Sequence, residues 1–165
     1  MLKEVKVAGL VKDPFQDTWI VMLEEKKEGK HILPIWVGQF EAHAILLEMS
    51  HKTPPRPLTH DLVKSILGLL GASIECIIVS ELVGSTFYAK LHLSKNGKTI
   101  EVDARPSDSI ALALRFQAPI YVDGKVIDQA GLENPKGIGK EIKDSDTWID
   151  EMFKDLERKG KGKEE

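Results

Sequence analysis

The sequence predicts an α+β fold, in which a mainly antiparallel sheet packs with three helices and a C-terminal amphipathic helix follows. Apolar and polar residues alternate through residues 2–11 and 18–25, which is the period of a half-buried strand. Asn96 and Gly97 separate two further alternating runs, and this dipeptide is a strong short-range signal for a hairpin. Between such runs, other segments repeat apolar residues every three or four positions, as amphipathic helices do.

The first part of the chain is expected to form three strands. LKEVKVAGLV and TWIVMLEE lie on either side of the turn-forming DPFQD, so we expect them to pair as a hairpin. HILPIWV follows the turn KKEGK as a third strand. Pro34 lies inside that strand and favours an edge position or a bulge, because proline has no N–H to donate to a neighbouring strand.

Two helices are expected next, separated by a stiff loop. Phe40, Ala44 and Leu47 recur at helical spacing in FEAHAILLEMS, so we expect them on the buried face of a helix that ends near residue 51. The proline-rich KTPPRP cannot continue a helix and is expected to be extended. We expect Thr59 to cap a second helix, which ends at Gly71.

One apolar face is expected on the second helix, and its members are Leu62, Ile66, Leu69 and Leu70. SIECIIVSELV, TFYAKLHLS and TIEVDA then predict three antiparallel strands. Ser107 is expected to cap a third helix through SDSIALALRF, and APIYV to return as a short strand. From Asp123 onward the pattern weakens.

A chain of 165 residues is long enough for one well-filled core. We expect one domain over residues 1–130, a linker rich in Gly, Pro and charge over 131–144, a helix over 145–158 and a solvated tail over 159–165. The helix is predicted by its apolar stripe, which consists of Trp148, Ile149, Met152, Phe153 and Leu156.

Composition excludes several classes of protein. The net charge of −3 argues against a protein that coats nucleic acid through general electrostatics. The single cysteine, Cys76, rules out an intramolecular disulfide and is expected to be a core residue on a strand. MLKEVKVAGL lacks the apolar stretch of a signal peptide, and no window is apolar enough to span a membrane, so we expect a cytoplasmic protein without membrane contact.

The first group of residues that could carry chemistry lies in PPRPLTHDL, where a proline-stiffened loop leads into a helix. A helix N-terminus favours anions, so Arg56 could clamp a phosphate there while His60 acts as a general base or acid beside Asp61. His51, at the entrance of the loop, could add charge near the substrate. The structural alternative is that Asp61 complements the helix dipole and Arg56 makes an ion pair.

The second group lies in VDARPSDSIAL, where a strand turns into a helix. Asp103 and Asp108 could hold a divalent cation, Mg²⁺ or Mn²⁺, while Arg105 and Ser107 contact a phosphate. The structural alternative is an ion pair between Arg105 and Asp103 that fixes the turn. Both alternatives stay open on the sequence alone.

Other residues are weaker candidates. Glu41 and His43, at the start of the first helix, are expected to be a solvated face. His31 and His92 lack the spacing of a structural zinc site. The chain has no P-loop, GxGxxG, GxSxG or HExxH motif, so we expect no organic cofactor.

Four segments together resemble the bifunctional nuclease domain family, in its order and spacing, over roughly residues 5–130: LPIWVGQFEAHAI, PRPLTHDLVKSILGLLGA, TFYAKLHL and VDARPSDSIALALRFQAPIYV. The resemblance implies an antiparallel α+β domain, cleavage of DNA and RNA, and frequent self-association, with a dimer favoured. Some members carry an appended two-helix motif, for which the predicted final helix is too short.

These patterns lead to one functional hypothesis and its rivals. The hypothesis is a phosphodiester hydrolase with little sequence preference, in which catalysis rests on Arg56, His60, Asp61 and Arg105. The rivals are a non-enzymatic module that binds a phosphate ligand, a nucleic acid or a protein, and a purely structural oligomer. The hypothesis requires the two proline-stiffened bends to bring their guanidinium groups and acids into a shared cleft.

Overall fold

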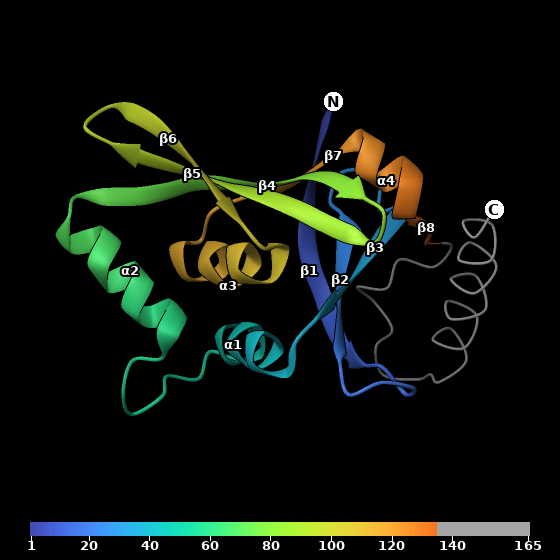
Figure 1. Cartoon of the computed structure of the whole chain (residues 1–165), viewed down its shortest axis with the longest axis horizontal. Helices are drawn as coiled ribbons and strands as arrows, with labels where there is room; N and C mark the ends of the chain where they lie inside the picture. The colour runs from blue at the N-terminus through green and yellow to red at the C-terminus, as the bar shows by residue number, and fades with distance from the viewer. Residues whose placement is uncertain (135–165) are drawn as a thin grey trace.

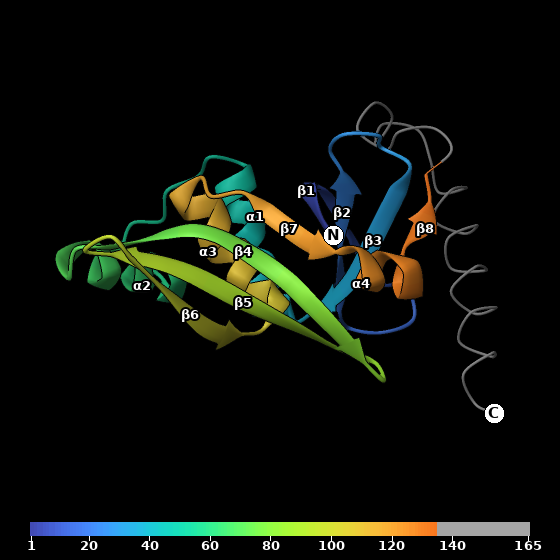
Figure 2. The same ribbon diagram turned by 90° about the horizontal axis from the view of Figure 1, so that it is seen from above.

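The computed structural model describes residues 1–134 and contains one eight-stranded sheet in the order β6-β5-β4-β7-β1-β2-β3-β8 (Figures 1 and 2). The strands are β1 (Leu2–Lys12), β2 (Trp19–Glu25), β3 (His31–Val37), β4 (Ala72–Val83), β5 (Thr86–Lys95), β6 (Lys98–Ala104), β7 (Ile120–Asp123) and β8 (Leu132–Glu133). The helices are α1 (Gln39–Met49), α2 (Thr59–Leu69), α3 (Pro106–Phe116) and α4 (Gly124–Ala130). The predicted α+β class is therefore confirmed. The helix and tail predicted for residues 145–165 lie outside the described residues.

The short strand β7 joins two antiparallel halves of the sheet. It pairs antiparallel with β1 and parallel with β4, and every other pairing among the described strands is antiparallel. In Figure 1, β4, β5 and β6 run across the top of α1, α2 and α3, whereas β1, β2 and β3 descend beside these helices. The three helices therefore lie in the angle between the two halves, with α2 and α3 against β4 and α1 against β2.

Helix α3 lies at the centre of the main core. Ile110, Ala111 and Ala113 are fully buried, and the helix packs against α1, α2, β4 and β5. On the sheet side the core includes Ile77 and Val79, which are also fully buried. Small alanines in the middle of α3 let neighbouring elements approach this helix closely.

Several predicted details are confirmed. β1 and β2 form the expected hairpin, and β5 and β6 are joined at Asn96 and Gly97, whose φ angles of 52° and 73° suit the predicted turn. β8 pairs only with His31 and Ile32 of β3. At Pro34 the strand is therefore an edge of the described sheet, which is where the proline was expected.

Both predicted helix caps are wrong by one or two positions. Thr59 is the first residue of α2, and Leu58 precedes the helix with an extended backbone. The Asp61 carboxylate accepts a hydrogen bond from the Leu58 N–H at 3.0 Å. The side chain that caps the start of α2 is therefore an aspartate inside the first turn and not the predicted threonine. Ser107 is buried in the first turn of α3, which begins at Pro106 because proline is well suited to that position.

The predicted buried face of α1 is also corrected at one residue. Phe40 is 86% exposed, and the buried residues are Ala42, Ala44 and Ile45. Close packing of α1 against α3 selects alanines, since a large ring at the contact would hold the two helices apart. Phe40 instead borders an apolar pocket of about 310 Å³ with neighbours that include Trp19.

The chain after Asp123 is more ordered than its sequence pattern predicts. The Asp123 side chain accepts a hydrogen bond from the Lys125 N–H at 2.9 Å and so caps α4, which the sequence did not reveal. Leu132 and Glu133 then pair with β3, although they fall in the predicted linker. The described part of that linker thus belongs to the sheet. Within residues 1–134, no helix is long and apolar enough to cross a membrane.

Candidate active site

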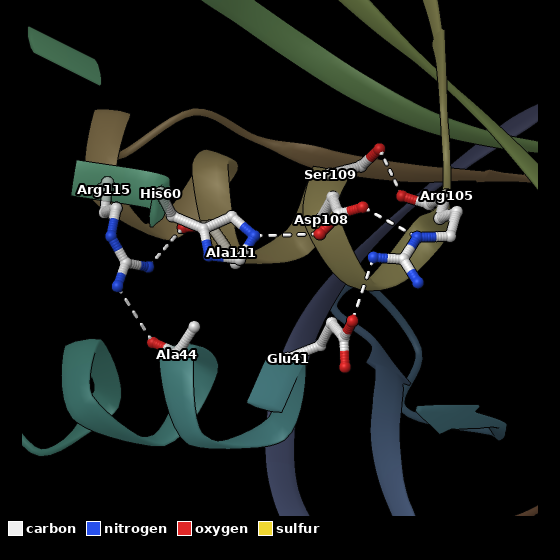
Figure 3. A network of polar contacts seen from close by, with 8 residues as sticks. All are labelled: Glu41, Ala44, His60, Arg105, Asp108, Ser109, Ala111 and Arg115. Carbon is white, nitrogen blue, oxygen red and sulfur yellow. Dashed lines mark hydrogen bonds and ion pairs between the residues drawn. The ribbon is translucent and has the colours of Figure 1, made fainter. Parts of the chain in front are cut away.

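The two proline-stiffened bends meet at the first turns of α2 and α3, which is one part of what the functional hypothesis requires. His60 lies in the first turn of α2 and Asp108 in the first turn of α3, and His60 Nε2 is 2.9 Å from Asp108 Oδ1 (Figure 3). The residues are 48 positions apart in the chain. The His60 side chain is 12% exposed, so the imidazole is held between the helices with only a small part open to solvent.

Arg105 completes a line of charged groups across three elements. Its Nε donates to Asp108 Oδ2 at 2.8 Å, and its Nη2 donates to Glu41 Oε1 at 2.9 Å. Figure 3 shows Arg105 between the N-terminal turn of α3 and α1. The Arg105 side chain is 65% exposed, so part of the guanidinium faces solvent even though two of its nitrogens are engaged.

The electrostatics of the cluster keep Asp108 ionised. Burial alone would raise the pKa of Asp108, but hydrogen bonds from Arg105 and His60 outweigh it and place the pKa below its ordinary value. An ionised carboxylate can only accept, so His60 Nε2 carries the hydrogen of the shared bond. In a neutral imidazole with this tautomer, the other ring nitrogen, Nδ1, holds a lone pair.

Glu41 belongs to this site, and its expected place on a solvated face is wrong. Its side chain is 19% exposed and is paired with Arg105, which lies 64 residues later in the chain. The carboxylate folds over Gly38, where a Cβ atom would collide with it. The only local signal for the contact between Glu41 and Gly38 was that α1 follows directly after a glycine and has a glutamate in its first turn.

Arg115 was missed by sequence reasoning, and it anchors the site from inside. Its side chain is 3% exposed, and its Nε donates to Asp61 Oδ1 at 2.8 Å. The other guanidinium nitrogens donate to the carbonyl oxygens of Ala111 at 2.8 Å and Ala44 at 3.2 Å (Figure 3). Arg115 therefore ties α1, α2 and α3 together.

A signal for Arg115 was present in the sequence. Arg115 follows Asp108 by seven residues and Ala111 by four, so all three share one face of α3. An arginine on an otherwise apolar helical face needs a partner, since a buried charge without one is strongly unfavourable. Because His60 and Asp61 are adjacent on α2, the first turn of α2 contacts both Asp108 and Arg115 of α3.

A pocket of about 500 Å³ lies beside the Asp61–Arg115 pair. Prolines of the stiff loop form one part of its lining, and the end of α1 forms another. Three cations and two acids contribute to it, namely Lys52, Lys64, Arg115, Glu48 and Asp61. The pocket has room for part of a ligand and polar groups to contact it.

Four predicted site residues are placed apart from the network. Arg56 and His51 are exposed on the loop between α1 and α2, and the side chain of neither forms a hydrogen bond or ion pair with another residue of the described part of the chain. Ser107 is 7% exposed and is not presented to a ligand from solvent. Asp103 lies on β6, where it is paired with Lys90 of β5.

The predicted metal pair does not fit this geometry. Side chains alternate along a strand, and Ala104 packs against the core, so Asp103 points to the other face of the sheet from Asp108. Both oxygens of Asp108 are already engaged by His60 and Arg105. Within residues 1–134, no group of three or more His, Cys, Asp or Glu side chains could hold a metal ion.

Comparison with known proteins gives a consistent match. The profile of a family described as "Bifunctional nuclease domain" matches residues 21–135. A Mycobacterium tuberculosis protein, named only as uncharacterized, is 46% identical over 132 residues, which is 80% of this chain and 78% of that protein.

Plant relatives are more distant. Bifunctional nuclease 1 of Oryza sativa subsp. indica is 28% identical over 116 residues, which is 68% of this chain and 35% of the rice protein. Bifunctional nuclease 1 of Arabidopsis thaliana is 30% identical over 115 residues, 63% of this chain and 35% of that protein. The chain thus spans about a third of the length of these plant relatives.

Proposed function

The chain belongs to the bifunctional nuclease domain family, and from this premise we propose that it hydrolyses phosphodiester bonds in DNA and RNA with little sequence preference. The rice and Arabidopsis relatives described above carry the name bifunctional nuclease. The observation that carries the proposal is the contact of His60 and Arg105 with the two oxygens of one carboxylate, Asp108. Asp108 thereby holds a candidate proton acceptor, His60, and a cation, Arg105, in one cluster.

In the proposed reaction, His60 is the general base. Asp108 accepts the hydrogen of Nε2, which fixes the ring orientation and leaves the lone pair of Nδ1 for the proton of an attacking water. The P–O bond to the leaving group breaks as the new P–O bond to the water oxygen forms. The proton that His60 has taken is then available to the leaving oxygen.

Arg105 is proposed to stabilise the charge that develops on the phosphate. A guanidinium has five N–H donors, and the hydrogen bonds of Arg105 to Asp108 and Glu41 use two of them. The remaining donors on this partly exposed side chain can bind non-bridging phosphate oxygens. Arg56, exposed on the stiff loop, is proposed as a second phosphate contact.

Asp61 was predicted to be a catalytic residue, and we now propose that it positions the helix instead. Its carboxylate is engaged by the Leu58 N–H and by Arg115, so we assign it to positioning the first turn of α2, which presents His60. The proposed reaction uses no metal ion held by Asp103 and Asp108, because these two carboxylates do not face each other. Cleavage assays with Mg²⁺, with Mn²⁺ and with a chelator will measure whether a cation is needed.

The test is a comparison of matched alanine variants. His60→Ala and Arg105→Ala are each expected to lower cleavage of labelled single-stranded DNA and RNA at least about tenfold. The matched controls are His92→Ala and Lys90→Ala, which remove a histidine and a cation that pair with Glu101 on the sheet. The controls are expected to cleave as the wild type does.

Two further readouts separate chemistry from folding. The pH–rate profile of the wild type should show a limb that depends on His60 and is absent in His60→Ala, while thermal melts confirm that each variant is folded. If both alanine variants cleave at the wild-type rate, the assignment of this site is wrong.

A second candidate function is a non-enzymatic module that binds a phosphate-containing ligand. The observation that favours it is the pocket beside Asp61, because Lys52, Lys64 and Arg115 all contribute to its lining. Purified protein that binds oligonucleotides but never cleaves them, with Mg²⁺ or Mn²⁺ present, would select this function. Under this second function Lys52→Ala should weaken binding, whereas under the nuclease proposal it should leave the cleavage rate unchanged.

A further inference from the structure

The apolar pocket beside the first turn of α1 has no part in the reaction proposed above. Its volume is about 310 Å³, and three elements form its walls, since Leu10 belongs to β1, Trp19 to β2 and the other residues to α1. The residues from α1 are Gln39, Phe40, Ala42, His43 and Leu46. Ligand pockets begin at about this volume, so there is room for one small ring system.

Two aromatic side chains give the pocket apolar walls. Phe40 is 86% exposed, although a ring of this size is normally stabilised by burial. Trp19 is half-buried and packs against the main core. It pairs with Val37 at the end of β3, and α1 begins two residues after Val37. The indole is thereby held beside the helix turn that carries Phe40.

The pocket adjoins the proposed active site through Glu41. Phe40 and Ala42, which line the pocket, flank Glu41 in the chain. The Glu41 carboxylate accepts a hydrogen bond from Arg105 Nη2 at 2.9 Å (Figure 3). Successive residues of a helix project about 100° apart, so Phe40 and Glu41 lie on neighbouring sides of one turn. A ligand bound at Arg105 can therefore reach the pocket by crossing that turn.

We propose that the pocket binds an unpaired nucleobase of the strand to be cleaved, so that the substrate is single-stranded where it crosses α1. The proposal rests on the nuclease function proposed above. A strand with one phosphate at Arg105 would pass over the first turn of α1 and place a neighbouring base against Phe40 and Trp19. A base inside a duplex is already stacked and paired, so only an unpaired base can enter the pocket.

The chemistry of the lining matches a nucleobase. Every base has a π-face and stacks on aromatic side chains, which agrees with a nuclease that has little sequence preference. Gln39 and His43 are exposed, and their side chains can form hydrogen bonds with the edge of a base. None of the lining residues in the described part of the chain is a lysine, an arginine or an acid, so the pocket suits an uncharged group.

The charge of the protein also favours a contact with bases. The chain has a net charge of −3, and Arg105 is itself paired with two carboxylates, those of Glu41 and Asp108. Attraction to the phosphate backbone alone is therefore weak. Stacking of one base on an aromatic side chain contributes about 1–3 kcal/mol, so Phe40 would supply affinity that the charges do not.

The test measures binding of labelled oligonucleotides by fluorescence anisotropy, with full-length protein in a His60→Ala background to slow cleavage. A normal single strand is compared with a strand of the same length in which abasic sites replace the bases, and with a blunt duplex. Phe40→Ala is expected to raise the dissociation constant of the normal strand at least about fivefold. Binding of the abasic strand and of the duplex should be weaker from the start and unchanged by this substitution.

Matched variants identify the contact as stacking. Phe40→Tyr keeps an aromatic ring and should retain the affinity that Phe40→Leu loses. Tyr88 is 44% exposed and alternates with the buried Ala89 on β5, so it lies on the face of the sheet opposite the helices. Tyr88→Ala should therefore bind as its parent does. Thermal melts of the Phe40 variants should be unchanged, because this side chain is already exposed.

Two results would overturn the proposal: a Phe40→Ala variant that binds the normal strand as tightly as its parent, and an equal loss of affinity for the normal and abasic strands. The nuclease function is judged separately, by cleavage in the wild type. Base binding through Phe40 without any cleavage would support the role of the pocket and reject the nuclease. Cleavage that depends on His60 but binding that is independent of Phe40 would do the reverse.

Discussion

Replacing Arg115 with alanine is expected to destabilise the protein by about 3 kcal/mol. Removal of one partner from a buried ion pair costs about 3–5 kcal/mol, because the remaining charge is left without compensation. Arg115 is 3% exposed, and its substitution would also free the carbonyl oxygens of Ala44 and Ala111. The Asp61 side chain is 27% exposed and can be partly hydrated, which places the loss at the lower end of that range.

The same pair predicts how stability depends on pH. Burial raises the pKa of Asp61, but hydrogen bonds from Arg115 and Leu58 outweigh it, so the pKa lies below the ordinary value of 3.8. A carboxyl whose pKa is lowered by folding stabilises the protein above its unfolded pKa, and this stability is lost as pH falls through the folded pKa. Asp61→Asn should therefore show less loss of stability below about pH 5 than the wild type.

Urea denaturation followed by circular dichroism measures the free energy of unfolding of each variant, and its repetition at several pH values measures how that free energy depends on pH. For a chain of this length, about 3 kcal/mol corresponds to a fall of roughly 6–12 °C in the melting temperature. Arg115→Lys is the matched control: it keeps the charge but loses the fork of donors, so its stability should fall between the wild type and Arg115→Ala. An Arg115→Ala variant within 1 kcal/mol of the wild type, or an Asp61→Asn variant with an unchanged acid limb, would refute the reasoning.

Three other predictions concern residues outside this pair. Gly97→Ala should destabilise the protein by about 1 kcal/mol in urea denaturation, because Gly97 has a φ of 73° in the β5–β6 turn; an unchanged midpoint would contradict this. Burial raises the pKa of the Cys76 thiol, so its alkylation at pH 8 should be slower than that of a small free thiol and should accelerate in urea; equal rates would count against it. Asp13→Ala should cost about 1–3 kcal/mol and alter tryptophan fluorescence, because the buried Asp13 accepts from Trp36 Nε1 at 2.9 Å; an unaltered spectrum would argue otherwise.

The strands and the larger helices could be predicted because their signals are local. Alternation along β1 and β2, the Asn96–Gly97 turn and the helical spacing in α3 each depend on neighbouring residues only. The meeting of the two bends was also predicted, and the His60–Asp108 contact places their helix starts together, although Arg56 of the first bend does not join that network. The meeting of the bends was predicted from residue chemistry and not from spacing, because each bend combines a proline-stiffened backbone with polar side chains at the start of a helix.

The missed parts depend on contacts between distant residues. The pairs Glu41–Arg105 and Asp61–Arg115 span 64 and 54 positions, and no spacing rule links their members. α4 has seven residues and β8 only two, so neither is long enough for a periodic pattern. On α2 the sequence predicted one apolar face with Leu62 and Ile66, but it could not indicate that Val63 would pack against the core while Leu62 stays exposed.

The position of β7 has a consequence for the order in which the chain folds. This strand of four residues begins at Ile120, yet it must pair with Val5 of β1 and Ile77 of β4 before the two halves of the sheet are joined. Each half contains hairpins that can form early from neighbouring segments, whereas the joining strand must close much longer loops. We therefore expect a slow final phase in refolding, in which the two hairpin units dock as β7 enters between them.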